Sequence, residues 1–488
     1  MSFLSRLEII YLVSSLCVLI GIFANNYSRK VGIPTLLIFL IVGMVAGSDG
    51  LGGIWFDNAP LAQVIGITSM IFILFIGGLD TNTENFAPII KPGIILSIFG
   101  VIISALIISF FTMLLLEISF WEGLLFGAII SSSDAVAVFS VLRSKDIKIK
   151  ESIRNIIEFE SASNDPVAIF LVITTLEVMS LPSLSTLSFI KIFVLQITIG
   201  GFFGFAFGKI LTMVMNKAQF SNENFYFIVS IFSILLCYGL TQSVHGSGFL
   251  AVYFAGIMLG HANFPRKKSL IILHDTLAWL MQVIMFLILG LFVFPRDLID
   301  YWWQGLLLSV ILIFFARPIS VLLCLIGSKF HFKEKLLISW GGFRGATPIV
   351  LALYPLTAKL PSAELIFDLV FIVVFVSILI QAPTFTFVSK ILGLATEHGF
   401  ASRFPMNFVV TQTLKSHLKE LTVTEKSPFV EKSLVQLNLP ESIRVVLIQR
   451  KQDVIAPRGT TILSAGDILL VLATTAEFDQ LKLTNQGA

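Results

Sequence analysis

Five neighbouring residues inside an apolar stretch hold the side chains best suited to chemistry. They are Glu160, Ser161, Asn164, Asp165 and Pro166, and the stretch is long enough to cross a membrane. A carboxylate in hydrocarbon is costly and usually marks an ion or proton path. A proline inside a helix frees a backbone carbonyl one turn earlier, and residues four apart share a helix face. Because hard oxygen ligands suit Na+ or K+, the pattern predicts a monovalent cation at Asp165.

Asp165 is the side chain of this stretch that we expect to titrate. One carboxylate can hold either a proton or a cation, so competition at one site combined with alternating access gives exchange. If Asp165 is the only carrier, the exchange is one for one and electroneutral. Asn164 has a side-chain carbonyl that can serve as a neutral ligand, although we interpret it mainly as a residue that fixes local structure.

Three serines and an aspartate interrupt a second apolar stretch. They are Ser131, Ser132, Ser133 and Asp134. Serine hydroxyls compete for backbone groups and weaken a helix, and non-helical backbone at membrane depth is tolerated only around a cavity or inside protein. A buried, serine-rich packing site is the alternative. We expect an unwound segment that faces Asp165, with Asp134 either a second ligand or the charge that neutralises the helix ends at the break.

A third interruption, Gly341–Pro348, contains a cation. Arg344 lies there within an apolar stretch, and an isolated arginine in hydrocarbon needs a partner. Glu160 is the first candidate and Glu158 the second. A Glu160–Arg344 pair is expected to be a structural clamp, which leaves Asp165 as the titrating group.

The composition defines a membrane protein. Of 488 residues, 56% are hydrophobic and 13% are charged, against about 25% charged in soluble domains. The net charge of +3 is too small to indicate nucleic-acid binding. Cys17, Cys237 and Cys324 lie in apolar segments without disulfide or zinc spacing, which predicts buried packing residues. No nucleophile–base grouping or metal spacing favours an enzyme, and we expect no cofactor.

Hydrophobicity predicts about thirteen spans, since a spanning helix needs about 20 mostly apolar residues. The spans start near residues 7, 33, 59, 90, 121, 153, 187, 224, 248, 271, 303, 334 and 363. Lysine and arginine gather in the loops after odd-numbered spans, which places the N-terminus outside and the C-terminus in the cytoplasm. The expected fold is an all-α polytopic membrane protein.

The two interrupted helices suggest inverted repeats. They are spans five and twelve, so they cross in opposite directions, and paired broken helices are the best sequence sign of a secondary-transporter site. Spans one to six then match spans eight to thirteen, with span seven as connector. A row of Gly200, Gly204 and Gly208 in span seven predicts close helix packing inside the subunit, with a dimer contact as the alternative.

After about residue 401 the chain becomes polar and rich in strand-forming residues. Two β-rich runs, Val445–Ile448 and Ile468–Leu472, are separated by Pro/Gly/Asp turn signals. We therefore expect a membrane domain over residues 1–398 and a small α+β cytoplasmic domain over residues 402–488.

At these motifs the membrane part resembles the monovalent cation/proton antiporter family, in particular its bacterial NhaP-like, potassium/proton branch. The resemblance rests on Glu160–Ser161, Asn164–Pro166, Ser133–Asp134 and Gly342–Ala346. It implies thirteen spans in the cell membrane, a homodimer, and a six-helix core that moves against a dimerisation domain. It also implies that Asp165 carries the ion and the proton, aided by Asp134, Ser161 and Ser133, and that Glu160 bridges to Arg344. The Asn164–Asp165 order implies electroneutral exchange.

The tail resembles the C-terminal lobe of regulator-of-potassium-conductance domains. The matching residues are Ser433–Leu434, Leu439–Pro440, Arg450, Ile455–Gly459 and Gly466–Asp467. Such lobes dimerise and bind small ligands, cyclic dinucleotides among them, so the resemblance implies regulation and favours K+ over Na+. A dimerisation module without a ligand is the alternative.

The predicted function is a regulated K+(Na+)/H+ antiporter, working in membrane lipid for cation and pH homeostasis. A gated cation channel is the alternative. Channels need a filter of repeated backbone-carbonyl loops, and the sequence contains no such repeat.

Overall fold

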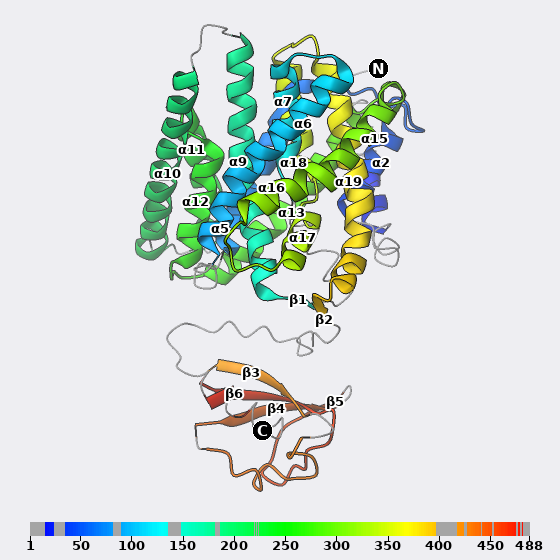
Figure 1. Cartoon of the computed structure of the whole chain (residues 1–488). Coiled ribbons are helices and arrows are strands. Elements are labelled where there is room, and N and C mark those ends of the chain that lie inside the picture. Colours follow the sequence, from blue (N-terminus) through cyan, green and yellow to red (C-terminus); the bar gives the residue numbers. More distant parts are fainter. Residues whose placement is uncertain are drawn as a thin grey trace. The chain divides into compact units, whose positions relative to one another are not determined.

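The chain folds into two compact units, Met1–Gly399 and Phe400–Ala488. In the computed structural model, the described residues are 15–23, 35–81, 89–134, 148–180, 186–218, 220, 222, 224–396, 417–423, 427–440, 442–450, 453–474, 477, 478 and 481. The first unit is a bundle of apolar helices, and the second is built on a β-sheet (Figure 1).

Eight long helical segments within the described residues are apolar enough to cross a membrane. They are α3 (Ala59–Asp80), α5–η1–α6 (Ile90–Ile95, Leu96–Gly100, Val101–Leu116), α9 (Glu151–Ser180), α10 (Thr186–Lys217), α11 (Asn224–Ser243), α13 (Lys267–Phe292), α15–η2–α16 (Trp302–Ile311, Leu312–Ala316, Arg317–Cys324) and α19 (Ala363–Ile391). Shorter helices are α2 (Thr35–Ala46), α7 (Phe120–Ser131), α12 (Gly248–His261), α14 (Pro295–Leu298), α17 (Phe332–Trp340) and α18 (Ala346–Thr357).

The all-α polytopic prediction is confirmed. From the second span on, each expected start lies at or beside the beginning of one of these helical segments. The expected first span is described as helix at residues 15–23, and its remainder lies outside the described residues. The second part of span five, after Asp134, also lies outside them. Cys17, Cys237 and Cys324 are buried, as expected of packing residues.

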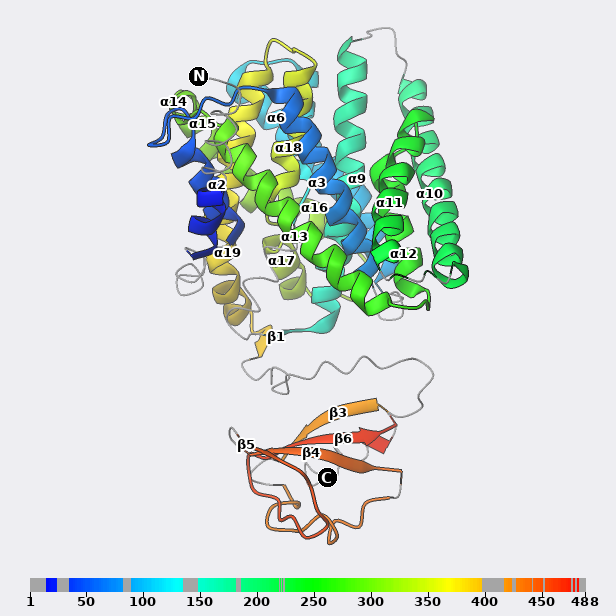
Figure 2. The ribbon, with the colours of Figure 1, turned by 180° about the vertical axis from the view of Figure 1, so that it is seen from behind.

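Two glycine-mediated helix crossings fit the expected pairing of spans between the halves. Gly43 of α2 packs on Gly290 of α13, and Gly78 of α3 packs on Gly256 of α12. A Cβ at position 256 would lie 2.5 Å from the Phe75 carbonyl oxygen, and one at position 290 would lie 2.2 Å from the Leu40 carbonyl oxygen. If spans two and three match spans nine and ten, the α2–α13 and α3–α12 crossings are equivalent contacts. Figure 2 shows α2, α3 and α13 on the face away from Figure 1.

Two other features support the matching of spans, the first in spans four and eleven and the second in spans five and twelve. One π-helical turn lies in span four (η1) and one in span eleven (η2). α7 and α17, the next helices along the chain, each have a glutamate in the first turn. This glutamate accepts a hydrogen bond from the backbone N–H of the residue three positions before it. Glu122 accepts from the Ser119 backbone N–H at 3.0 Å, and Glu334 accepts from the His331 backbone N–H at 2.8 Å. Such reciprocal caps satisfy orphan donors at a helix start.

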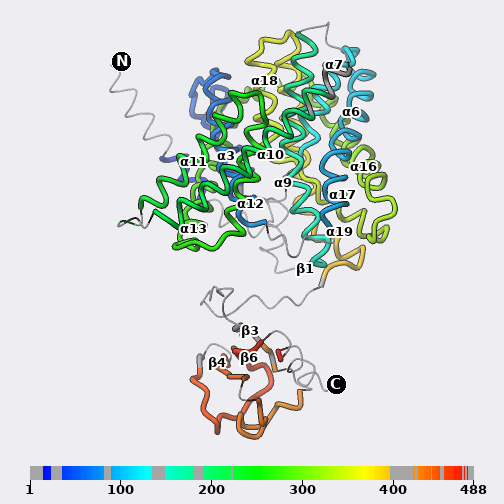
Figure 3. Tube along the Cα trace, turned by 90° about the vertical axis from the view of Figure 1, so that its left-hand side faces the viewer, coloured from blue at the N-terminus to red at the C-terminus, as the bar shows by residue number. Residues whose placement is uncertain are grey.

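Helices α10, α11 and α12 lie together at one edge of the bundle in Figure 1, and this side faces the viewer in Figure 3. The glycine row of α10 faces α12: Gly200 contacts Ser247, Gly204 contacts Ala251 and Gly208 contacts Met258. The glycine row therefore packs α10 against α12 within the subunit, as the first of the two interpretations predicts.

The second unit contains an antiparallel sheet with strand order β3-β6-β4-β5. Its strands are β3 (His417–Thr422), β4 (Arg444–Arg450), β5 (Asp453–Ile455) and β6 (Ile468–Ala473). One face buries a cluster that includes Leu421, Leu463 and Val471. Arg450 binds Asp467 through two hydrogen bonds of 2.9 and 2.7 Å, which raise the pKa of the arginine above its usual value.

A two-stranded antiparallel sheet belongs to the first unit. It pairs β1 (Lys148–Ile149) with β2 (Ala395–Thr396), in the register Lys148 to Thr396 and Ile149 to Ala395. β1 directly precedes α9, and β2 follows α19 after a left-handed Gly393. Left-handed glycine commonly ends a helix because it carries no Cβ.

Candidate functional site

The polar residues in the middle of α9 lie on the face turned toward the two broken helices, which are α7 with the segment after it and α17 with α18. Glu160, Asn164 and Asp165 are buried at 1%, 0% and 9% exposure. Pro166 lies within the continuous helix α9, so the proline does not end it. The predicted site residues of α9 and of the serine-rich segment are therefore brought together.

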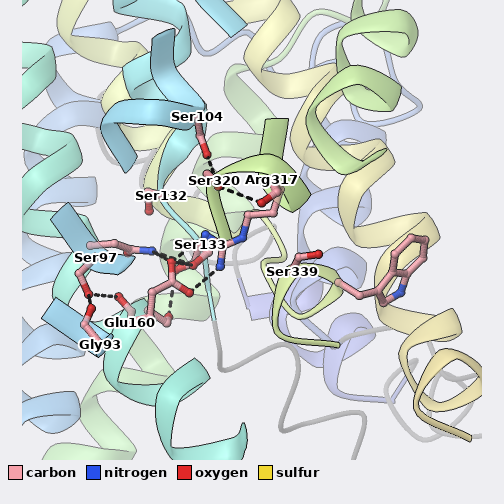
Figure 4. Close-up of polar contacts among 12 residues, drawn as sticks. Gly93, Ser97, Ser104, Ser132, Ser133, Glu160, Arg317, Ser320 and Ser339 are labelled. Carbon is pink, nitrogen blue, oxygen red and sulfur yellow. Dashed lines mark hydrogen bonds and ion pairs between the residues drawn. The ribbon is translucent and has the colours of Figure 1, made fainter. Parts of the chain in front are cut away.

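Glu160 is neutralised by an arginine of span eleven (Figure 4). Arg317 donates from Nη1 to Oε1 at 3.0 Å and from Nη2 to Oε2 at 2.6 Å. Both side chains are at most 2% exposed. Bidentate arginine–carboxylate pairs are short and strong, and a buried pair of this kind is kept together because separating it leaves an uncompensated charge.

The expected Glu160–Arg344 pair is therefore corrected to Glu160–Arg317. Arg344 is also buried, but its Nη1 donates to the Ser132 backbone carbonyl at 3.0 Å, and its backbone N–H donates to Ser377 Oγ at 3.1 Å. The reason is geometric. The unwound segment after α7 presents the Ser132 carbonyl to Arg344, whereas Arg317 begins α16 and reaches Glu160 past Gly342. A Cβ at Gly342 would lie 2.4 Å from Arg317 Nε.

Among the described residues, both hydrogen-bond partners of Asp165 are hydroxyls. Ser132 Oγ donates to Oδ1, and Thr347 Oγ1 donates to Oδ2 at 3.1 Å. Within the part of the chain that the structure describes, no basic side chain forms an ion pair with Asp165. Two carboxylates on one helix thus have different surroundings: Glu160 is charge-paired and Asp165 is not.

The two broken helices hydrogen-bond to each other where both are unwound. After α7 the chain is not helical over Ser132, Ser133 and Asp134, and the Asp134 backbone N–H donates to the Phe343 carbonyl at 2.7 Å. Asp134 lies against Gly345, where a Cβ would be 2.1 Å from its Oδ2. Gly345 is the N-cap of α18, and helix N-termini favour an anion.

This geometry confirms the expected unwound segment facing Asp165. It also fits the alternative in which Asp134 neutralises a helix end at the break. The interruption predicted over Gly341–Pro348 is shorter in the structure, where α17 ends at Trp340 and α18 begins at Ala346.

Ser133, Asn164 and Ser161 tie α9 to the unwound segment. Asn164 Nδ2 donates to Ser133 Oγ at 2.7 Å and to Glu160 Oε1 at 3.0 Å. Ser133 Oγ in turn donates to Glu160 Oε1 at 3.3 Å, and Ser161 Oγ donates to the Ser133 carbonyl at 2.9 Å. Asn164 therefore fixes local structure, as interpreted from the sequence. Its Oδ1 is buried without a hydrogen-bond partner among the described residues.

Sequence reasoning missed three residues of the site. Ser132 and Thr347 belong to recognised motifs but were given no role, and Arg317 was not considered. Its signal was available, because Arg317 followed by Pro318 interrupts an apolar run, and an intramembrane arginine is rare enough to mark a partner. The preference of Arg317 over Arg344 for Glu160 depends on packing, which the sequence does not show.

Paired broken helices around a buried, uncompensated carboxylate define a secondary transporter. Comparison with known proteins agrees. The profile of the family described as "Sodium/hydrogen exchanger, transmembrane" matches residues 13–391, and that of the TrkA-C domain matches residues 418–483. The chain belongs to the sodium/hydrogen exchanger family.

Individual relatives support this assignment. The chain is 36% identical to the K(+)/H(+) antiporter NhaP of Alkalimonas amylolytica, with 97% of this chain and 83% of the relative covered. It is 34% identical to the K(+)/H(+) antiporter NhaP2 of Shewanella sp. strain ANA-3, with 96% and 82% covered. The solved sodium proton antiporter MjNhaP1 of Methanocaldococcus jannaschii is similar in fold, with a TM-score of 0.70 and 26% identity over 80% of this chain and 99% of that chain.

The predicted activity class is thereby confirmed. The protein is a membrane antiporter that exchanges a monovalent cation for a proton, and its C-terminal TrkA-C domain fits a regulated transporter. The channel alternative is not favoured.

Proposed function

We propose that the protein exchanges K+, and also accepts Na+, for H+ one for one at Asp165. The observation that carries this proposal is the contrast on α9. Glu160 has a counter-ion in Arg317, whereas the partners of Asp165 among the described residues are the hydroxyls of Ser132 and Thr347. A buried carboxylate without a fixed counter-ion is stable when it holds a proton or a cation, so the two compete.

The other predicted residues complete the site. Asp134, next to the N-terminus of α18, helps to hold the cation, while Ser161, Ser133 and Asn164 fix the geometry around it. The Glu160–Arg317 pair is structural. Because only Asp165 alternates between proton and cation, each cycle moves one charge in each direction and is electroneutral.

K+ is the proposed main cation. Two relatives that cover most of this chain are named K(+)/H(+) antiporters, and the tail carries a TrkA-C domain. The solved structural neighbour is a sodium proton antiporter, which supports Na+ as a second substrate.

The test is a pH-gradient assay in proteoliposomes. K+ or Na+ added outside should dissipate an imposed proton gradient, and an applied membrane potential should not change the rate. Asp165→Asn should abolish exchange. Glu158→Gln is the matched control on the same helix, since Glu158 pairs with Arg154 at 3.8 Å near the helix start. Full exchange by Asp165→Asn excludes Asp165 as the carrier.

Orientation, assembly and regulation are also proposed. The distribution of Lys and Arg supports a cell-membrane protein with the N-terminus outside and the C-terminal unit in the cytoplasm. We propose a homodimer that is regulated by a small ligand of the TrkA-C domain, a cyclic dinucleotide being one candidate. Cross-linking in membranes, and binding of cyclic di-AMP to the full-length protein followed by calorimetry, test these points separately.

A further inference from the structure

Asp165 is held between hydroxyls from two different broken helices. Ser132, after α7, donates to Oδ1, and Thr347, the second residue of α18, donates to Oδ2 at 3.1 Å. Thr347 is half-buried, whereas the residues on either side of it are buried. Its hydroxyl is thus the contribution of the second inverted half to the carboxylate.

A threonine hydroxyl offers one donor and two acceptor lone pairs. It can donate to Asp165 when the carboxylate is ionised and empty. The same hydroxyl can rotate and present its oxygen to a cation that sits on the carboxylate, because oxygen is the ligand that Na+ and K+ prefer. A methyl group can do neither.

We propose that Thr347 is a cation ligand of the exchange site and sets its cation affinity. This inference depends on the proposed role of Asp165. It adds a ligand from α18 to those of α9, so that the cation is held by both halves. Since the contact joins two helices of different halves, loading the site with a cation favours the arrangement in which α18 lies against α9.

The experiment compares Thr347→Val, Thr347→Ala and Thr347→Ser in proteoliposomes with the parent protein. Losing one hydrogen bond to a charged group should raise the half-saturating K+ concentration about tenfold in the Val and Ala variants, with the maximal rate nearly kept. Thr347→Ser should restore the affinity to within about threefold, because it keeps the hydroxyl. The Ala and Ser pair decides the question if the valine variant does not fold.

Unchanged K+ affinity in Thr347→Ala overturns this inference. If Asp165→Asn is inactive in the same experiment, the proposed carrier role still stands. A fall of maximal rate in all three variants, serine included, would assign Thr347 to packing rather than to the cation, and also overturns the inference.

A separate observation concerns the β1–β2 pair. β1 is followed directly by α9, the helix of Asp165, and β2 is the last described element before the second unit. Next to β1, Lys150 Nζ forms a 2.8 Å ion pair with Glu334, the glutamate that caps α17. α17 leads into the break that contains Arg344.

Apolar packing strengthens this connection. Ile149 and Leu394 pack on one cluster that also contains Ile153 of α9, Leu337 of α17 and Phe385 of α19. The start of the site helix, the start of the second broken helix and the end of α19 are therefore joined at one place.

We infer that the β1–β2 pair transmits the state of the C-terminal unit to the exchange site. β2 ends at Thr396 and the second unit begins at Phe400, so the chain joins the two units through β2, which is paired with β1 just ahead of α9. This does not depend on Asp165 being the carrier.

A double-mutant cycle tests this coupling in the full-length chain. Val471→Asp places a charge in the core of the C-terminal sheet, where Val471 is fully buried. Ala395→Pro removes a β2 backbone donor, and Ile149→Pro does the same in β1 if the first variant does not fold. Val471→Asp should change the exchange rate at least about threefold in the parent and less than about 1.5-fold in the proline background.

Two results overturn the coupling. One is an equal effect of Val471→Asp in both backgrounds. The other is no effect of Val471→Asp in the parent, since there is then nothing to transmit.

Discussion

Two acidic side chains of α9, only five positions apart, have opposite surroundings. Glu160 accepts hydrogen bonds from Arg317, Asn164 and Ser133, and its charge is matched by a guanidinium. Asp165 meets hydroxyls alone among the described residues. The first arrangement fixes one charge state, whereas the second allows two occupants. At the scale of the residue, the presence of a counter-ion distinguishes Glu160, a structural residue, from Asp165, the proposed carrier.

The ion pair gives a prediction about stability. Arg317→Met leaves Glu160 buried and unpaired, which should cost about 3–5 kcal/mol and lower the melting temperature in detergent. Glu160→Gln combined with Arg317→Met should be less destabilising than Arg317→Met alone, because the uncompensated charge is gone.

Arg344→Met serves as the control. Arg344 contacts the Ser132 carbonyl rather than a carboxylate, so its loss should reduce stability less than the loss of Arg317 and should reduce transport. If Arg344→Met is the more destabilising variant, Arg344 rather than Arg317 neutralises Glu160.

Glycines decide how closely the elements approach. In the broken segment Gly342 makes room for Arg317 and Gly345 makes room for Asp134. In the continuous helices Gly43, Gly78, Gly256 and Gly290 form the two matching crossings. Close backbone approach is what small residues contribute to helix packing in membranes, where apolar burial gives little preference. At the scale of the element, the close glycine crossing is repeated in the two halves, whereas Gly342 and Gly345 both belong to one broken segment.

Two glycine-to-alanine variants distinguish the effect of the close helix crossing from that of helix propensity. Gly256→Ala places a Cβ 2.5 Å from the Phe75 carbonyl oxygen, and should destabilise the protein by about 1–3 kcal/mol. Gly77→Ala, one residue from the same crossing, meets nothing within 4 Å and should be neutral or stabilising by about 0.5–1 kcal/mol through helix propensity. Thermal unfolding in detergent measures both. Equal melting temperatures would contradict the close crossing.

At the scale of the whole molecule, the two units have separate hydrophobic cores. The cores of the helical unit are formed by apolar helices, and that of the second unit by Leu421, Ile448, Leu463 and Val471, among others. Each unit has its own buried interior, as expected of independent domains. The proposed regulation therefore needs a physical connection, and the β1–β2 pair at the end of α19 provides a candidate.

Separate cores predict separate folding. A fragment of residues 400–488 should fold by itself, with a β-rich circular dichroism spectrum and a cooperative thermal transition. Val471→Asp in that fragment should abolish the transition, since an unpaired carboxylate in the core costs several kcal/mol. A fragment that is unfolded without the helical unit would show that the second core depends on the first.

The sequence alone determined the class of protein, the spans, the two breaks and the carrier candidate. Each rests on local rules: apolar length sets a span, a serine run or a Gly–Gly pair breaks a helix, and a carboxylate in hydrocarbon marks a site. The tertiary structure alone decided the partners. Two buried arginines, Arg317 and Arg344, were both available to Glu160, and only the tertiary placement of Arg317 at the start of α16 brings it to Glu160. The hydroxyl of Thr347 is placed on Asp165 by a helix 182 positions away along the chain, which no local pattern can reveal.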